Sequence, residues 1–169
     1  MGPTHKLLAP LGAQTVIETT LDAVLGASLD DVIVVTGAVD LTSVLPDTVI
    51  EVRNRSWADG QATSLIAGVE HAESLGHDAV IVGLGDQPGV GSEAWRRLAN
   101  SSGLLAIATY YGLRRNPVRL SRAIWPLLSR TGDEGARTLV RARPDLVVEV
   151  PCDGIPDDID TQEDLSQWN

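Results

Sequence analysis

The sequence has 169 residues, 43% of them hydrophobic, which suits a single domain over 1–169 with an apolar core. Its formal net charge of −10 at pH 7 argues against a nucleic-acid partner, which would require a basic patch. It contains one cysteine, Cys152, and no apolar run near the roughly 18 residues of a membrane span, so we expect a cytoplasmic protein with no membrane partner.

Hydrophobic periodicity predicts strands that alternate with helices after an opening loop over 1–12. In the first half of the chain the predicted elements are a helix over 15–25, strands over 31–36 and 49–52, a polar loop over 54–60, a helix over 64–75 and a strand over 79–84. The second half is predicted to contain a helix over 92–100, a strand over 104–109, a turn over 112–116 and a short extended piece over 117–120. Helices over 121–128 and 134–142, a strand over 146–150 and a helix over 161–168 follow. This alternation predicts a three-layer, Rossmann-like α/β fold with a mainly parallel sheet.

The strand over 79–84 is followed by an acid, Asp86, and a turn fixed by Pro88. The strand is a continuous apolar run, which is typical of a strand buried on both faces. A carboxylate at the carboxyl end of such a strand lies in the crevice where α/β sheets bind ligands. The alternative is that Asp86 only caps the turn.

A second acidic feature lies near the end of the chain, where residues 153–164 contain six carboxylates and no basic residue. Capping of the last helix by Thr161, with Glu163 and Asp164 in its first turn, explains part of this cluster. Asp158 and Asp160 alternate in an extended segment and so share one face. One of them could join Asp86 on a divalent cation, and hard oxygen ligands suit Mg²⁺.

Several polar segments could hold anions. Lys6 lies in a Gly- and Pro-rich segment and could balance a phosphate, although a lone Lys is usually only solvated. Residues 59–64 open a helix whose free amides could hold an anion or a base edge. Arg114, Arg115 and Arg137 could bind a second anionic substrate, or could be surface charges.

A dinucleotide-binding fingerprint is a further alternative, because Gly83-Leu84-Gly85 follows a strand. The third glycine, Gly89, comes one position late for the usual spacing. Asp86 would also face the pyrophosphate. Both features argue against a Rossmann dehydrogenase.

Seven short segments have the order and spacing of one protein family. They are Met-Gly-Pro-Thr-His-Lys-Leu-Leu at 1–8, Val-Val-Thr-Gly at 34–37, Asn54 ahead of Gly-Gln-Ala-Thr-Ser-Leu at 60–65, Gly-Asp-Gln-Pro at 85–88, Arg-Arg-Asn-Pro-Val at 114–118, Gly-Asp-Glu-Gly-Ala-Arg at 132–137 and Asp-Ile-Asp-Thr-Gln-Glu-Asp-Leu at 158–165. Each is weak alone, but together they span nearly the whole chain. The sequence resembles the MobA-like nucleotidyltransferases, most closely the molybdenum cofactor cytidylyltransferase (MocA-like) branch.

The resemblance implies a reaction in which a phosphate of a molybdopterin-type acceptor attacks the α-phosphorus of a nucleoside triphosphate, with Mg²⁺ bound and pyrophosphate released. It implies that Asp86 and Asp160 hold Mg²⁺ and that Lys6 neutralises the triphosphate. The residues implied in nucleotide binding are Gly2, Lys6, Thr36, Gly37, Asn54, Gly60, Thr63, Ser64 and Gly85. Those implied in acceptor binding are Arg115, Asn116, Pro117, Gly132, Asp133 and Arg137. A molybdoenzyme or its chaperone would receive the product.

The sequence departs from the family at its start. Family members begin with a strand and a Leu-Ala-Ala-Gly-x-Ser-x-Arg-Met-Gly loop, and this sequence starts at that Met-Gly. Loss of a central strand would leave its two neighbours with unpaired backbone groups, so we expect Met1 to be an internal methionine of the natural protein. A non-catalytic accessory protein of the same fold is the rival interpretation.

The same departure bears on the substrates. The missing loop helps to separate cytidylyl from guanylyl members, so the preference for CTP over GTP rests on Gly-Asp-Gln-Pro at 85–88. Asn116 stands where many relatives carry His, which leaves the acceptor open.

Overall fold

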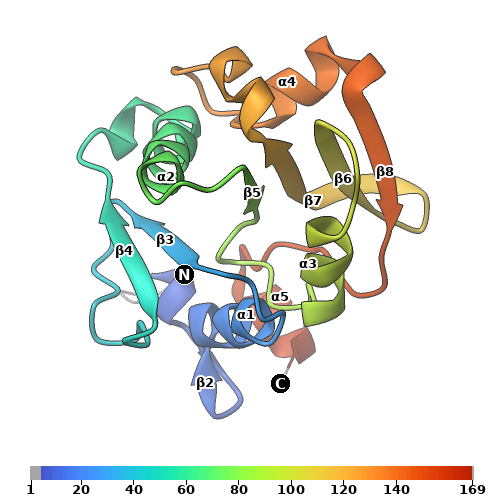
Figure 1. The fold of residues 1–169 in the computed structure, drawn as a ribbon. Coiled ribbons are helices and arrows are strands. Elements are labelled where there is room, and N and C mark those ends of the chain that lie inside the picture. The colour runs from blue at the N-terminus through green and yellow to red at the C-terminus, as the bar shows by residue number, and fades with distance from the viewer. Residues whose placement is uncertain (1–4, 169) are drawn as a thin grey trace.

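The computed structural model describes residues 5–168, which form an α/β fold (Figure 1). Its helices are α1 (Val16–Leu25), α2 (Gln61–Ser74), α3 (Ser92–Ala99), α4 (Arg137–Ala142) and α5 (Gln162–Trp168). Its strands are β1 (Pro10–Leu11), β2 (Gln14–Thr15), β3 (Val32–Thr36), β4 (Val49–Arg53), β5 (Ala79–Val82), β6 (Leu105–Tyr110), β7 (Leu113–Ser121) and β8 (Val147–Pro151). Short 3₁₀ turns are η1 (Lys6–Leu8), η2 (Trp57–Asp59), η3 (Arg122–Leu127) and η4 (Pro144–Leu146). No helix within residues 5–168 has the length and apolar character needed to cross a membrane.

The centre of the main sheet is β6, in which every residue is buried. Its side chains alternate between two apolar layers, as the period of a strand requires. Leu105 and Ile107 pack with α2, β7, η3 and α4, whereas Ala106 and Ala108 pack with α1, α3 and residues of β8. The sheet therefore lies between two layers of helices, which confirms the predicted α/β architecture.

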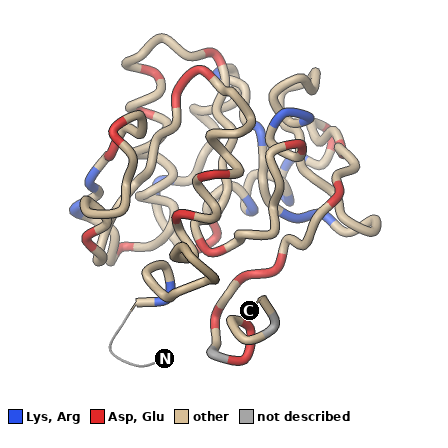
Figure 2. Tube along the Cα trace, turned by 90° about the horizontal axis from the view of Figure 1, so that it is seen from below, with Lys and Arg blue, Asp and Glu red and all other residues tan. Residues whose placement is uncertain are grey.

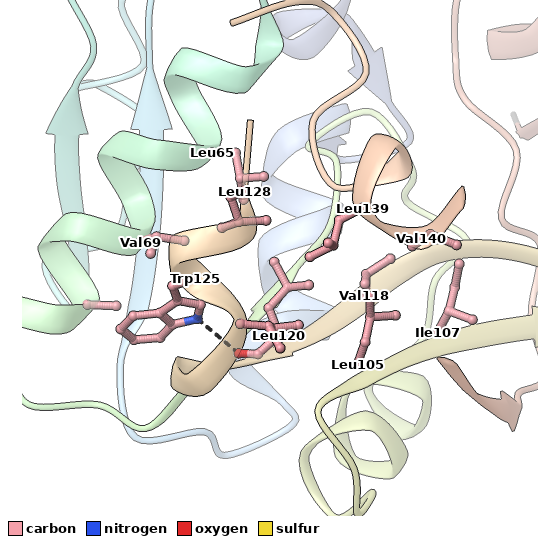
Figure 3. Packing of buried hydrophobic residues seen from close by; sticks show 12 residues of the cluster. Leu65, Val69, Leu105, Ile107, Val118, Leu120, Trp125, Leu128, Leu139 and Val140 are labelled. Carbon is pink, nitrogen blue, oxygen red and sulfur yellow. Dashed lines mark hydrogen bonds between the residues drawn. The ribbon is translucent and has the colours of Figure 1, made fainter. Parts of the chain in front are cut away.

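The first of these layers is anchored by Trp125 of η3 (Figure 3). Trp125 is 7% exposed and lies in one cluster with Leu65 and Val69 of α2 and with Leu139 of α4. Its indole N–H donates a hydrogen bond to the Leu120 carbonyl at 3.1 Å, so the buried polar atom of this large side chain is satisfied.

Strand β7 corrects the prediction of a turn over 112–116. It begins at Leu113 and pairs with β6 through a tight turn at Tyr111 and Gly112, both of which have positive φ. The register shifts between Ile107 and Ala108, which pair with Val118 and Arg115, so Asn116 and Pro117 form a bulge in β7. A proline has no N–H to donate to a sheet, which explains its place in the bulge.

Other boundaries also differ from the prediction. Helix α2 begins at Gln61 rather than at 64, and α4 begins at Arg137 rather than at 134. The segment predicted as a helix over 121–128 is the 3₁₀ turn η3, which contains Pro126. A proline inside a helix removes a hydrogen bond and clashes with the preceding turn, which favours the short 3₁₀ form.

The described strands do not form one continuous sheet. Strands β3 and β4 form a parallel pair, while the second sheet has the order β5-β7-β6-β8, in which only β7 runs against the other three. Between β3 and β5 lies a cleft of about 1230 Å³ lined by both strands and by apolar residues of α1 and α2. Neither β3 nor β5 has a strand partner on its cleft side among residues 5–168.

Candidate active site

Three charged side chains meet at the carboxyl end of β5. The Lys6 Nζ lies 2.5 Å from an Asp86 carboxylate oxygen and 2.7 Å from an Asp160 carboxylate oxygen. The exposed fractions of these side chains are 29% for Lys6, 14% for Asp86 and 63% for Asp160. The fold thus brings Asp86 and Asp160 to the Lys6 ammonium, although they lie 80 and 154 positions after Lys6 in the sequence.

Backbone contacts hold the two acids in place. The Ile159 N–H donates to the Asp86 carbonyl at 2.9 Å, and the Ile155 N–H donates to the Gly89 carbonyl at 3.0 Å. These bonds tie the acidic C-terminal segment to the turn after β5. Figure 2 shows the acidic residues along this segment on its way to α5. Ile159 is fully buried, so the residues on either side of it are fixed by an apolar anchor.

The charges influence one another. Partial burial lowers the pKa of Lys6, but the hydrogen bonds and charges of Asp160 and Asp86 outweigh that effect and hold it above its ordinary value. Burial raises the pKa of Asp158, and the charges of Asp86 and Asp160 raise it further against the opposing effects of Gln87 and Lys6. The charged groups discussed here are therefore mostly carboxyl groups, those of Asp86, Asp158 and Asp160. The Lys6 ammonium lies within reach of two of them, Asp86 and Asp160.

Gln87 is the residue of this region that sequence reasoning missed. Its side chain is buried, and its amide donates to the Pro156 carbonyl at 3.0 Å and to Asp158 at 2.6 Å. Asp158 therefore faces Gln87, and Asp160 is the acid that reaches Lys6. The role of Gln87 depends on the pairing of residues 86–89 with 155–159, and no local pattern in the sequence predicts that pairing.

Four of the predicted nucleotide-binding residues lie together at the start of α2: Asn54, Gly60, Thr63 and Ser64. Asn54 is buried and donates to the Thr63 and Ser64 hydroxyl oxygens at 2.8 and 3.0 Å. The Thr63 hydroxyl donates in turn to the Gly60 and Ser56 carbonyls. This network fixes the first turn of α2, so Asn54 and Thr63 act at least in part as structural residues.

Thr36 and Gly37 close β3 beside this network. The Thr36 hydroxyl donates to Glu51 at 2.7 Å. A Cβ at Gly37 would lie 2.6 Å from the Cβ of Trp57, so the indole covers this glycine closely. Gly2, predicted in the same group, lies outside the described residues.

Part of the predicted acceptor group, the segment over 132–137, lies next to this start of α2. The Ala62 N–H donates to the Gly132 carbonyl at 2.9 Å, and a Cβ at Gly60 would lie 2.8 Å from an Asp133 carboxylate oxygen. The segment over 132–137 thus contacts the segment over 60–64. The structure thus brings Gly60 of the predicted nucleotide group next to Gly132 and Asp133 of the predicted acceptor group.

The cleft connects these parts. Leu7 and Gly85 line it near the Lys6–Asp86–Asp160 group, and Gln61 and Ser64 line it where α2 begins. Other lining residues include Arg115, Asn116 and Arg137, while Pro117 is almost fully buried behind them. A single molecule in the cleft could therefore contact residues predicted for both substrates.

A divalent cation fits the donor set of this site in part. The Asp86 and Asp160 carboxylates already converge on one cation, the Lys6 ammonium, and both are hard oxygen donors. No group of three or more His, Cys, Asp or Glu side chains that could hold a metal occurs within residues 5–168. The two carboxylates match the Mg²⁺ sites that take one or two carboxylates and complete the shell with water and substrate phosphates.

The glycines near β5 have packing roles. A Cβ at Gly83 would lie 2.5 Å from the Trp95 ring, and a Cβ at Gly85 would lie 2.9 Å from Ile17. The next helix, α3, begins only at Ser92, so these glycines do not lead directly into a helix as a dinucleotide fingerprint requires. This arrangement agrees with the rejection of that alternative.

Comparison with known proteins identifies relatives of the whole chain. It is 29% identical to the nicotine blue oxidoreductase of Paenarthrobacter nicotinovorans over 98% of this chain and 88% of the relative. Its structure superposes on that of Rv0371c from Mycobacterium tuberculosis with a TM-score of 0.84 and 28% identity, covering 98% of this chain and 89% of the other. A manganese complex of Rv0371c gives 0.83, with 26% identity and coverages of 98% and 92%.

A further structure, described as a nucleotidyl transferase from Methanothermobacter thermautotroptrophicus, gives a TM-score of 0.81 and 28% identity, covering 98% of this chain and 83% of the other. The family model described as the MobA-like NTP transferase domain matches residues 1–147. This match covers most of the 169 residues and includes Lys6 and Asp86. The chain belongs to the MobA-like NTP transferase family.

Proposed function

We propose that this nucleotidyltransferase-family protein transfers CMP from CTP to a phosphate of a molybdopterin-type acceptor and releases pyrophosphate, with Mg²⁺ as its metal. The observation that carries the proposal is the convergence of Lys6, Asp86 and Asp160 beside a cleft. The lining of this cleft includes Ser64 and Gly85 of the predicted nucleotide group and Arg115, Asn116 and Arg137 of the predicted acceptor group. Phosphoryl-type transfers depend mainly on positioning and charge neutralisation, so no side-chain nucleophile is needed.

Each charged residue has a role in this proposal. Asp86 and Asp160 would hold the cation, which when bound would neutralise charge on the phosphates. Lys6 would contribute a positive charge to the triphosphate, for which the flexible side chain of a lysine is suited. A divalent requirement is supported by the manganese complex of the related Rv0371c.

The choice of substrates rests on the resemblance and on the cleft. Arg115 and Arg137 line the cleft and offer positive charge to an acceptor phosphate. CTP is favoured over GTP by the Gly-Asp-Gln-Pro segment at 85–88. As in the resemblance, we place the reaction in the cytoplasm and name a molybdoenzyme or its chaperone as the recipient of the product.

The test is pyrophosphate release from CTP or GTP in the presence of molybdopterin, with and without Mg²⁺. We expect release with CTP that depends on Mg²⁺ and exceeds release with GTP. Asp86→Asn should lower the rate on the order of 100-fold or more, since it removes a carboxylate proposed to hold the cation that would neutralise the developing phosphate charge. Asp153→Asn is the matched control, because Asp153 lies in the same acidic segment with its side chain 92% exposed, and its rate should be unchanged.

Two results would contradict the proposal. Equal rates for wild type and Asp86→Asn would exclude the metal assignment. If the protein binds nucleotide but releases no pyrophosphate in the presence of molybdopterin and Mg²⁺, the accessory-protein alternative is favoured. Binding of CTP and GTP can be followed separately by calorimetry, so that a loss of chemistry is distinguished from a loss of binding.

A further inference from the structure

The carboxylates proposed to hold a metal are already neutralised by a cation from the chain itself. The Lys6 ammonium is within 2.7 Å of both Asp86 and Asp160. An ammonium has three donors and no acceptor, so it uses the same carboxylate lone pairs that a divalent cation would use. Lys6 and a metal ion therefore compete for Asp86 and Asp160.

The local structure allows Lys6 to leave this position. Its side chain is 29% exposed, it belongs to the three-residue turn η1, and Asp160 is largely exposed. The Lys6 ammonium lies at the end of a flexible stem of four carbons, and it can form a favourable ion pair with any anion that this stem reaches. A triphosphate bound in the neighbouring cleft is such an anion, with more charge than either carboxylate.

We propose that Lys6 is an exchangeable internal cation, which pairs with Asp86 and Asp160 in the free protein and moves to the nucleotide phosphates as a divalent metal replaces it. This inference rests on the proposed function and adds an order to it: the free protein binds metal weakly, and nucleotide binding makes the carboxylates available. By linkage, a metal bound to the carboxylates also favours the nucleotide-contacting position of Lys6.

Metal binding without nucleotide provides the first test. Free Mn²⁺ is measured by electron paramagnetic resonance as it is titrated into wild-type protein, Lys6→Met, Lys6→Arg and Arg96→Met. We expect Lys6→Met to bind Mn²⁺ more tightly than wild type by about 5- to 150-fold, the usual range of coupling between two sites. Lys6→Arg keeps the charge and should stay near wild type.

Arg96→Met is the charge-matched control. It removes one positive charge from a pair with Glu93 on α3, at 3.0 Å, so its net charge equals that of Lys6→Met. A general gain of affinity from a more acidic protein would appear in both variants. The proposal requires a gain in Lys6→Met that clearly exceeds the gain in Arg96→Met, and equal gains would overturn it.

The second test follows Lys6 in the unmodified protein. Lys6 is the only lysine in the sequence, so protein labelled with ¹⁵N-lysine has one side-chain ammonium signal in an NMR spectrum. We expect this signal to be visible in the free protein, because ion pairing slows exchange of its protons with water. Mg²⁺ at saturating concentration should shift or remove the signal, and so should a non-hydrolysable CTP analogue without metal.

The outcomes separate this inference from the proposed function. If Mn²⁺ binds equally well with and without the CTP analogue and Lys6→Met does not change its affinity, Lys6 does not compete with the metal, and only this inference fails. If wild type binds no Mn²⁺ even with the analogue, and Asp86→Asn behaves in the same way, the metal site of the proposed function fails as well.

Discussion

At the residue scale, Gly60 lies where the segment predicted to bind the nucleotide meets the segment predicted to bind the acceptor. Its φ is +111°, a conformation that L side chains rarely adopt, and a Cβ there would lie 2.6 Å from the Gly132 carbonyl oxygen. The obstacle is backbone, which cannot swing away as the end of a side chain can. Gly60 therefore allows the segment over 132–133 to approach the start of α2 closely.

Gly60→Ala should therefore destabilise the protein more than the same substitution at a glycine that also has a positive φ but has no close neighbour at its Cβ position. Gly76 is the matched control, because its φ is +88° and nothing lies within 4 Å of the Cβ position. We expect Gly76→Ala to lower the free energy of unfolding by about 1–3 kcal/mol from backbone strain alone. Urea unfolding followed by circular dichroism measures both variants, and equal losses would show that the contact with Gly132 is unimportant.

The structure places the predicted residues of the candidate site in different surroundings. Lys6, Asp86 and Asp160 were predicted from motif and resemblance, and the structure brings their charged groups together. Thr63 was predicted to line a ligand, but its hydroxyl also donates to two carbonyls of the chain. A motif identifies which residues recur at a site, whereas the hydrogen-bond partners of each residue depend on contacts that only the folded chain supplies.

At the element scale, α1 contacts the turn that carries Asp86. Thr15 and Glu18 form a capping box, in which the Thr15 hydroxyl accepts from the Glu18 N–H and the Glu18 carboxylate accepts from the Thr15 N–H. The Thr20 hydroxyl donates to the Gly85 carbonyl at 3.1 Å, next to Asp86. Helix α1 thus contributes, through Thr20, to the position of the turn that carries Asp86.

The capping box predicts a pH-dependent stability. Hydrogen bonds from the side chain and backbone of Thr15 lower the pKa of Glu18. A carboxyl with a lowered folded-state pKa adds stability above its unfolded pKa of about 4.3, and loses it as the pH falls through the folded value. Glu18→Gln should therefore cost about 0.3–1 kcal/mol at pH 7 and progressively less below pH 4.

Thermal unfolding at several pH values between about 3 and 7 measures this dependence. Thr15→Ala should cost about 1 kcal/mol at pH 7 through loss of the cap, while Thr15→Ser keeps the hydroxyl and should remain close to wild type. A cost of Glu18→Gln that stays constant down to pH 3 would contradict the role of its charge.

Elements with strong apolar periodicity were predicted well, and the exceptions have local causes. The bounds of α1, β3, β4, α3 and β6 agree with the prediction to within one or two residues. The first part of β7 was predicted as a turn because Arg114, Arg115 and Asn116 are polar and a proline follows. Pairing with β6 keeps this polar and largely exposed segment in a strand, and such pairing is a long-range effect that local propensity does not contain.

At the scale of the whole molecule, the cleft between β3 and β5 is the largest departure from a continuous sheet. Within residues 5–168, β3 pairs only with β4 and β5 pairs only with β7, so the edge that each strand turns to the cleft has no strand partner. All residues of β5 and the first four of β3 are partly exposed despite their apolar character, whereas β6, with partners on both edges, is buried throughout. The volume and shape of the cleft depend on how four elements pack, which no single stretch of sequence specifies.

The open edges predict a specific pattern of hydrogen exchange. Successive amides of a strand point to opposite edges, so every second amide of β3 and of β5 points toward the cleft. These amides should exchange faster than their immediate neighbours, which are paired with β4 or β7. The amides of β6 are the internal reference, since β7 and β8 flank both of its edges and should protect successive residues alike. Exchange measured residue by residue with NMR tests this, and uniform protection along β5 would mean that its cleft-side edge is paired in solution.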